Sequence, residues 1–196
     1  MSDGLLTIAA QYREDGEFGP GWYSGMLALN QRYCRGYFEI RCTCAPGGGF
    51  WSAFWLQGDG SYDHDISRGG VGAAEIDIME APYYNETGAK HNAITSAIHC
   101  NGGDDAPDKI DSHLVGRFNG NDIYNTFNTY GLKWTESEYI FYINGMETAR
   151  TDFSKGVSQA FEEVIVSLEI PANVSHTEDF RTDMMVDYVR IYQETI

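Results

Sequence analysis

The sequence predicts an all-β protein in which two antiparallel sheets pack face to face. Three observations support this fold class. Apolar and polar residues alternate with period 2, and β-branched and aromatic residues are frequent in the alternating runs. Clusters of Gly, Asn and Asp break these runs at short intervals. Helical patterning is limited to a short candidate at residues 152–158. Short strands joined by such turns are typical of a two-sheet sandwich.

The first strands are expected around a glycine-rich turn. Residues 37–43 alternate as a strand does, and Pro46 and three glycines then turn the chain. An aromatic strand follows at 50–56, and the polar, Gly- and Asp-rich stretch 58–72 is expected to be a loop. Later strands are expected at 74–80, 93–100, 126–134, 164–170 and 184–192.

The clearest local signal is a β-hairpin. Residues 139–143 and 146–151 are two β-forming runs separated by Asn144-Gly145. Asn-Gly is the preferred pair for a two-residue hairpin turn, because both positions need a positive φ.

Composition excludes several functions. The chain has 196 residues and a formal net charge of −16, whereas nucleic-acid binding requires a basic face. The same charge disfavours an anionic membrane surface, and no apolar run approaches the roughly 18–20 residues of a membrane span. Aromatic residues make up 14% of the chain, which suits a neutral polyhydroxy ligand. We expect residues 1–196 to form a single domain, since no linker or repeat divides them.

Four cysteines leave two interpretations open. Cys42 and Cys44 share one face of a predicted strand, while Cys34 and Cys100 lie elsewhere. Their spacing does not match a repeated zinc-binding pair, so buried free thiols are favoured over a metal site or disulfides.

The sharpest chemical feature is the strand 75–80, Glu-Ile-Asp-Ile-Met-Glu. Glu75 and Asp77 share one face, but strict alternation would bury Glu80 in the core. Burying an unpaired carboxylate is costly, so we predict a one-residue bulge near Met79 that returns Glu80 to the face of the other two acids.

Three acids on one face favour glycoside hydrolysis over a solvated acidic edge. With the bulge, Glu75 and Glu80 lie four strand positions apart, roughly 13 Å at Cα. Leaning side chains can then approach the separation of about 5–5.5 Å used by retaining glycosidases. Repulsion raises the pKa of at least one acid, giving a protonated acid beside an ionised nucleophile.

These residues resemble glycoside hydrolase family sixteen. The strand 75–80 is similar to the bulged signature of its laminarinase-like endo-β-glucanases and some algal galactanases. Further segments resemble the family in its order: 3–6, 36–41, 49–56, 97–99, 132–135, 142–145, 167–169 and 186–190.

The resemblance implies a fold and a mechanism. The fold would be a concanavalin-like β-jelly-roll of two curved antiparallel sheets, with a concave substrate cleft. Glu75 would be the nucleophile, Glu80 the general acid/base and Asp77 an assisting carboxylate. Hydrolysis would proceed by double displacement on β-1,3- or mixed β-1,3-1,4-glucan.

The same resemblance implies substrate-binding residues. Trp51, Trp55 and Trp134 would form a sugar-stacking floor, although core packing is the ordinary role of Trp on a strand. His99 and Tyr83 would lie near the acids and at the cleft wall.

One departure from the family pattern affects the N-terminal end. The chain starts almost at the early strand of the family, so we expect the usual first strand or strands to be lacking.

The resemblance also implies which metals and cofactors are needed. The family's optional structural calcium would lie near Asp187, while catalysis would require no cofactor.

Other functions remain open. A non-catalytic glucan-binding lectin, a transglycosylase and a neutral galactanase are compatible with the same fold. The expected partner is a neutral β-glucan bound by a monomer, with no nucleic acid or membrane. The substrate class implies a secreted or extracellular location.

Overall fold

The computed structural model describes residues 4–58, 73–82, 92–101, 110–153, 157–170, 177 and 179–193. Within these ranges the chain forms thirteen strands and no helix. The strands are β1 (Leu6–Arg13), β2 (Gly21–Tyr23), β3 (Met26–Ala28), β4 (Gly36–Thr43), β5 (Trp51–Gln57), β6 (Glu75–Pro82), β7 (Ala93–Asn101), β8 (Ile110–Asn119), β9 (Asn128–Trp134), β10 (Tyr139–Ile143), β11 (Met146–Thr151), β12 (Glu163–Glu169) and β13 (Arg181–Tyr192). Among these residues, no helix is long and apolar enough to cross a membrane.

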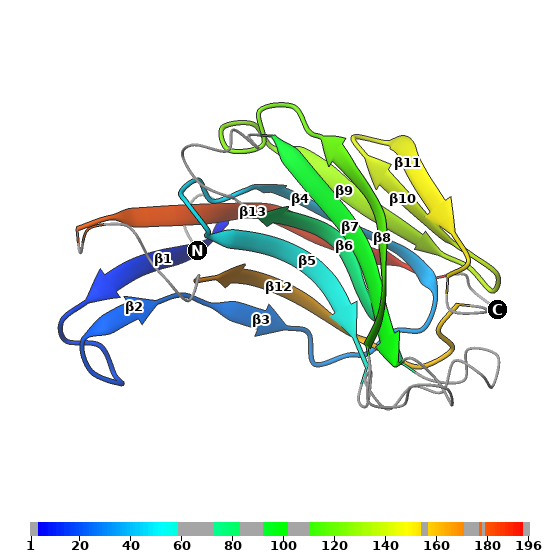
Figure 1. Cartoon of the computed structure of the whole chain (residues 1–196), viewed down its shortest axis with the longest axis horizontal. Helices are drawn as coiled ribbons and strands as arrows, with labels where there is room; N and C mark the ends of the chain where they lie inside the picture. The colour runs from blue at the N-terminus through cyan, green and yellow to red at the C-terminus, as the bar shows by residue number, and fades with distance from the viewer. Residues whose placement is uncertain are drawn as a thin grey trace.

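The strands form two antiparallel sheets, which confirms the predicted fold class. One sheet has seven strands in the order β11-β10-β9-β4-β13-β1-β2, and the other has six in the order β3-β12-β5-β6-β7-β8. Figure 1 shows the curved strands of the two sheets, with β5, β6 and β7 side by side. The strand β6 is therefore central in its sheet, with a hydrogen-bonded neighbour on each side.

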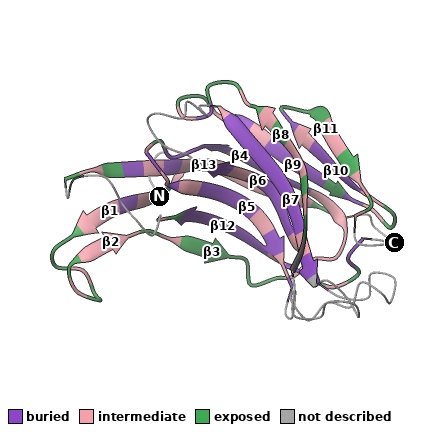
Figure 2. Ribbon diagram, in the orientation of Figure 1, coloured by how far each residue is buried: buried purple, intermediate pink, exposed green. Residues whose placement is uncertain are grey.

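Among the described residues, one hydrophobic cluster fills the space between the sheets. Phe38 and Ile40 of β4 reach it from the seven-stranded sheet, and Phe54 and Ile76 reach it from the six-stranded sheet. Figure 2 shows buried residues along the central strands, whereas the edge strand β3 is exposed. Because alternate residues of β5 and β6 are fixed in this core, the residues between them face away from it.

The hairpin forms as the sequence predicts. β10 and β11 pair on either side of Asn144 and Gly145, which have φ values of 51° and 76°. The Asn144 side chain also accepts a hydrogen bond from the Thr129 amide at 2.9 Å, which ties the turn to the start of β9.

The cysteines are free thiols, as favoured by the sequence. Cys42, Cys44 and Cys100 are fully buried, and Cys34 is partly exposed. Burial raises the pKa of the Cys42 thiol well above its ordinary value, and the neighbouring Cys44 raises it further.

The structure differs from the sequence-based expectation in several strands and in the helix candidate. The strands β2, β3 and β8 were not expected, and β1 extends to Arg13 beyond the early segment 3–6. The helix candidate at 152–158 is not borne out at its described ends, since residues 152–153 and 157–158 form no helix. Residues 154–156 lie outside the described part of the chain.

Candidate active site

A β-bulge in β6 places the acids. Glu75 pairs in register with Gln57 on β5 and His99 on β7, while Glu80 pairs with Ala53 and Thr95. Five steps along β6 therefore correspond to four steps on each neighbour, and the register shifts lie between Asp77 and Glu80. The predicted bulge is confirmed.

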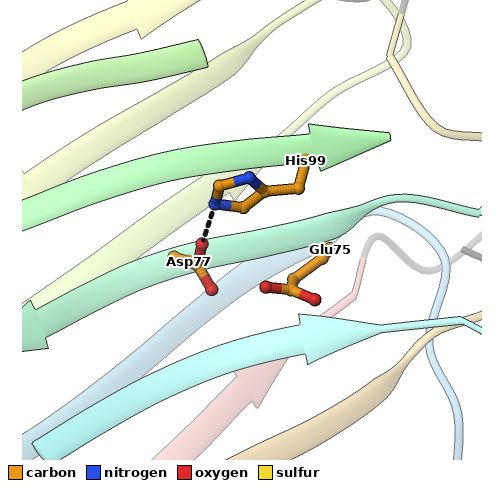
Figure 3. Close-up of side chains that lie close together, drawn as sticks. All are labelled: Glu75, Asp77 and His99. Atoms are coloured by element: carbon orange, nitrogen blue, oxygen red, sulfur yellow. Dashed lines mark ion pairs between the residues drawn. The ribbon is translucent and has the colours of Figure 1, made fainter. Parts of the chain in front are cut away.

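The bulge allows two consecutive apolar residues of β6 to be buried on the same side of the strand. Ile78 and Met79 are both almost fully buried in the hydrophobic cluster, although adjacent residues of a regular strand would face opposite sides. Glu75, Asp77 and Glu80 consequently share the face of β6 that is turned away from the core. Figure 3 shows Glu75 and Asp77 on this face beside His99.

Each acid has a polar partner from a neighbouring strand. Gln57 Nε2 donates a hydrogen bond to Glu75 Oε2 at 3.0 Å, and Trp51 Nε1 donates one to Glu80 Oε1 at 2.9 Å. His99 Nε2 lies 3.1 Å from Asp77 Oδ2. These contacts hold the three carboxyl groups in fixed directions.

Asp77 is the most buried of the three acids. Its pKa is raised to about 6, with burial as the largest cause; contact with His99 opposes this rise, and the Glu75 charge adds to it. The same contact raises the pKa of His99. His99 Nδ1 is also 2.7 Å from Ser112 Oγ on β8, so the imidazole is held between two strands.

Glu80 has the pKa expected of a general acid at neutral pH. Its pKa is raised to about 7, mainly by burial and also by the Asp77 charge, while the Trp51 hydrogen bond acts in the opposite direction. A carboxyl group with such a pKa can donate a proton in one step and accept one in the next.

Glu169 is a fourth carboxyl group near the site that sequence reasoning missed. It ends β12, pairs in register with Trp51, and has a pKa raised by burial and by the charge of Glu75. Strand alternation could have placed this carboxyl group, since Glu169 lies two residues after Ser167 and so shares its face of β12. Ser167 Oγ accepts a hydrogen bond from Trp55 Nε1 at 3.1 Å on the same face.

The structure places the predicted sugar-stacking residues in different regions. Trp51 and Trp55 lie on β5 beside the acids, and both are half-buried. The prediction that Trp134 stacks on sugar is wrong. Trp134 is only 1% exposed, packs in the core against Phe38, and donates a hydrogen bond to the Ser158 carbonyl. A ring without exposed surface cannot stack on a sugar. Tyr83 lies outside the described residues.

Two places bear on metal binding. Glu75, Asp77 and His99 offer ligand atoms within 4.8 Å of one another, a spacing that a cation can bridge. Asp187, where the resemblance implies calcium, forms an ion pair with Arg41 in which Nη1 lies 2.5 Å from Oδ2. A calcium ion there would have to bind beside the guanidinium or displace it.

Comparison with known proteins identifies similar chains. The family model described as glycosyl hydrolases family 16 matches residues 2–190. The chain is 27% identical over 202 residues to the endo-1,3-1,4-beta-glycanase ExsH of Rhizobium meliloti (strain 1021). That alignment covers 98% of this chain but 39% of ExsH, so the chain spans about two fifths of the length of this relative.

Solved structures share the fold. LamAcat from Zobellia galactanivorans superposes with a TM-score of 0.75 at 19% identity, over 98% of this chain and 79% of that one. A kappa-carrageenase from the same organism has a TM-score of 0.73 at 20% identity, over 100% and 81% of the two chains.

Proposed function

Because the chain belongs to glycosyl hydrolase family 16, we propose that it is a retaining endo-glycoside hydrolase that cleaves β-1,3- or mixed β-1,3-1,4-glucan. One observation carries this proposal. The bulge in β6 places Glu75, Asp77 and Glu80 on one face, with Glu80 at a pKa of about 7. The name of the relative ExsH, an endo-1,3-1,4-beta-glycanase, supports the substrate class.

In the first step, Glu75 attacks the anomeric carbon while Glu80 donates its proton to the leaving glycosidic oxygen. The bond from the anomeric carbon to that oxygen breaks, and a covalent glycosyl ester forms on Glu75. The raised pKa of Glu80 keeps its proton available near neutral pH.

In the second step, the ionised Glu80 takes a proton from water, and the resulting hydroxide displaces the sugar from Glu75 with net retention. Asp77 lies between the two acids and is held by His99. Its negative charge disfavours ionisation of Glu80 and so helps to restore the proton for the next cycle.

A substrate panel tests the proposal. We expect reducing sugar to be released from laminarin and barley β-glucan, with little from agarose, and oligosaccharide products by mass spectrometry. Tight glucan binding without products would instead indicate a lectin. Products longer than the added acceptor would indicate transglycosylation, and release from agarose alone would indicate a galactanase.

We also propose that the protein acts outside the cell, because polymeric glucan cannot enter cells intact. The expectation that it acts as a monomer stays a prediction. The mechanism requires no cofactor, since side chains supply the nucleophile and the acid/base.

Calcium near Asp187 remains a prediction with its own test. Calcium chloride should raise Tm relative to chelator if an ion binds the folded state, and Asp187→Asn should remove that rise. Equal Tm values in calcium and chelator would contradict a calcium site.

A further inference from the structure

One buried carboxyl group is not used by the proposed mechanism. Glu162 immediately precedes β12 and is 0% exposed. It has the parity of Val164 and Val166, two residues that β12 turns into the core. Its backbone is fixed as well, because the Glu162 N–H and C=O pair with the C=O and N–H of Tyr33 at 2.9 Å each.

The side chain of Glu162 is linked to the residue before Glu75. The Ala74 amide donates a hydrogen bond to Glu162 Oε1 at 3.0 Å. The Ser158 hydroxyl donates a second bond to the same oxygen at 2.5 Å. Among the described residues, Glu162 Oε2 is buried without a hydrogen-bond partner.

Close packing surrounds this link. A Cβ atom added to Gly58, at the end of β5, would lie 2.2 Å from Ala73 Cβ and 3.4 Å from Glu162 Cγ. The end of β5, the start of β6 and the Glu162 side chain therefore meet without spare space. Gln57, next to Gly58, is the residue that donates to the Glu75 carboxylate.

The carboxyl group acts here as a neutral acceptor. Burial raises the pKa of Glu162 to about 8, while the hydrogen bonds from Ser158 and Ala74 lower it. At pH 7 the group is mostly protonated and carries no charge into the core. A glutamine at this position would keep the acceptor oxygen and the neutral state.

We propose that Glu162 is a positioning residue for the nucleophile: its anchoring of the Ala74 amide fixes where β6 begins and hence the direction of the Glu75 carboxylate. This inference rests on the proposed function. Removing the acceptor leaves a buried N–H unsatisfied, and the backbone beside Glu75 must then move to find a partner. Small displacements of a reacting group are costly, up to about 100-fold in rate for a shift near 1 Å.

The experiment compares three variants of the full chain. Glu162→Met keeps the side-chain length but offers no oxygen, and Glu162→Gln keeps the acceptor. Ser158→Ala is the matched control, because it removes the other hydrogen bond to Oε1 and leaves the bond from Ala74. Initial rates on laminarin give kcat and KM, and hydrogen exchange is followed at the Ala74 amide.

We expect Glu162→Met to lower kcat by about tenfold or more with KM within about threefold, because positioning acts on the reacting step. Exchange at Ala74 should accelerate by about tenfold, because its amide loses its partner. Glu162→Gln should restore both values, and Ser158→Ala should change neither kcat nor Ala74 exchange even if it lowers Tm.

Other results overturn the inference. A folded Glu162→Met variant with unchanged kcat and unchanged Ala74 exchange shows that Glu162 does not position Glu75. Equal losses of kcat in Glu162→Met and Ser158→Ala show a general structural role. If the unaltered chain releases no sugar, the proposed hydrolase fails; an active unaltered chain with normal kcat in Glu162→Met overturns the positioning role alone.

Discussion

Glu75→Gln should abolish the release of reducing sugar from β-glucan, with kcat lowered by roughly 10⁴-fold or more, as for the loss of other catalytic nucleophiles. The amide cannot form the glycosyl ester, but it can still accept the hydrogen bond that Gln57 donates to Glu75. The fold should therefore persist, and unchanged circular dichroism and Tm would check this. Initial rates on laminarin and barley β-glucan measure the effect.

Glu39→Gln is the matched control for this change. Glu39 is on β4 of the other sheet, where its carboxylate accepts hydrogen bonds from Tyr37 and Tyr188. The control should keep kcat within about twofold, because it alters the same chemical group far from the proposed reaction. A Glu75→Gln variant that releases sugar at a rate close to that of the unaltered chain would exclude Glu75 as the nucleophile.

A second large effect is expected from Glu80→Gln. It should lower kcat on β-glucan by roughly 10²–10⁴-fold, the usual contribution of a positioned general acid. For an aryl glucoside with a good leaving group, Glu80→Gln should lower the rate of the first step much less, because such a group departs without protonation. Rates on the two substrates, measured side by side, separate acid catalysis from substrate binding.

The pH profile offers an independent readout of Glu80. The proton donor is lost as the pH rises through its pKa, so kcat/KM should fall at alkaline pH with a midpoint of about 7. Trp51 donates a hydrogen bond that favours the ionised form, so Trp51→Phe should move this midpoint to higher pH. The midpoint is the measured quantity, since loss of the indole is also expected to change KM.

The interpretation of Glu80 would be wrong in either of two cases. In the first, Glu80→Gln retains the alkaline fall in kcat/KM, which would assign that titration to another group. In the second, glucan and aryl glucoside lose the same factor, which would point to binding or structure rather than proton donation.

Much of the site could be predicted because it depends on local alternation. The burial cost of a carboxylate was enough to predict the bulge, and the paired registers of Glu80 with Ala53 and Thr95 confirm it. The hairpin was also predictable from local sequence, since the two turn residues, Asn144 and Gly145, are of the types that tolerate the positive φ values that the turn requires.

Features set by tertiary contacts were harder to predict. β3 has three residues, all exposed, and exists because it pairs with β12 at the sheet edge. Trp134 was misassigned because its aromatic character outweighed its parity. It alternates with Lys133 and shares a face with Leu132, which is in the core.

The contacts of Glu162 and of the proposed catalytic acids could not be predicted, because they join residues that lie far apart in the sequence. Glu162 has the parity of the core residues Val164 and Val166, but only the folded chain brings its oxygen to Ala74, 88 positions earlier in the sequence. Similarly, the link between Gln57 and Glu75 spans 18 positions and depends on the pairing of β5 with β6.

The bulge also has a consequence for comparing sequences. A homologous strand without the extra residue would place its last acid one position earlier, although that acid would occupy the same place on the sheet. An alignment gap in that homologue opposite Ile78, the residue skipped in the pairing of β6 with β5, therefore equates acids that are spatially equivalent, whereas ungapped alignment would match Glu80 to a residue on the opposite face. Evolutionary distances and ancestral sequences inferred for this strand depend on placing that gap by structure.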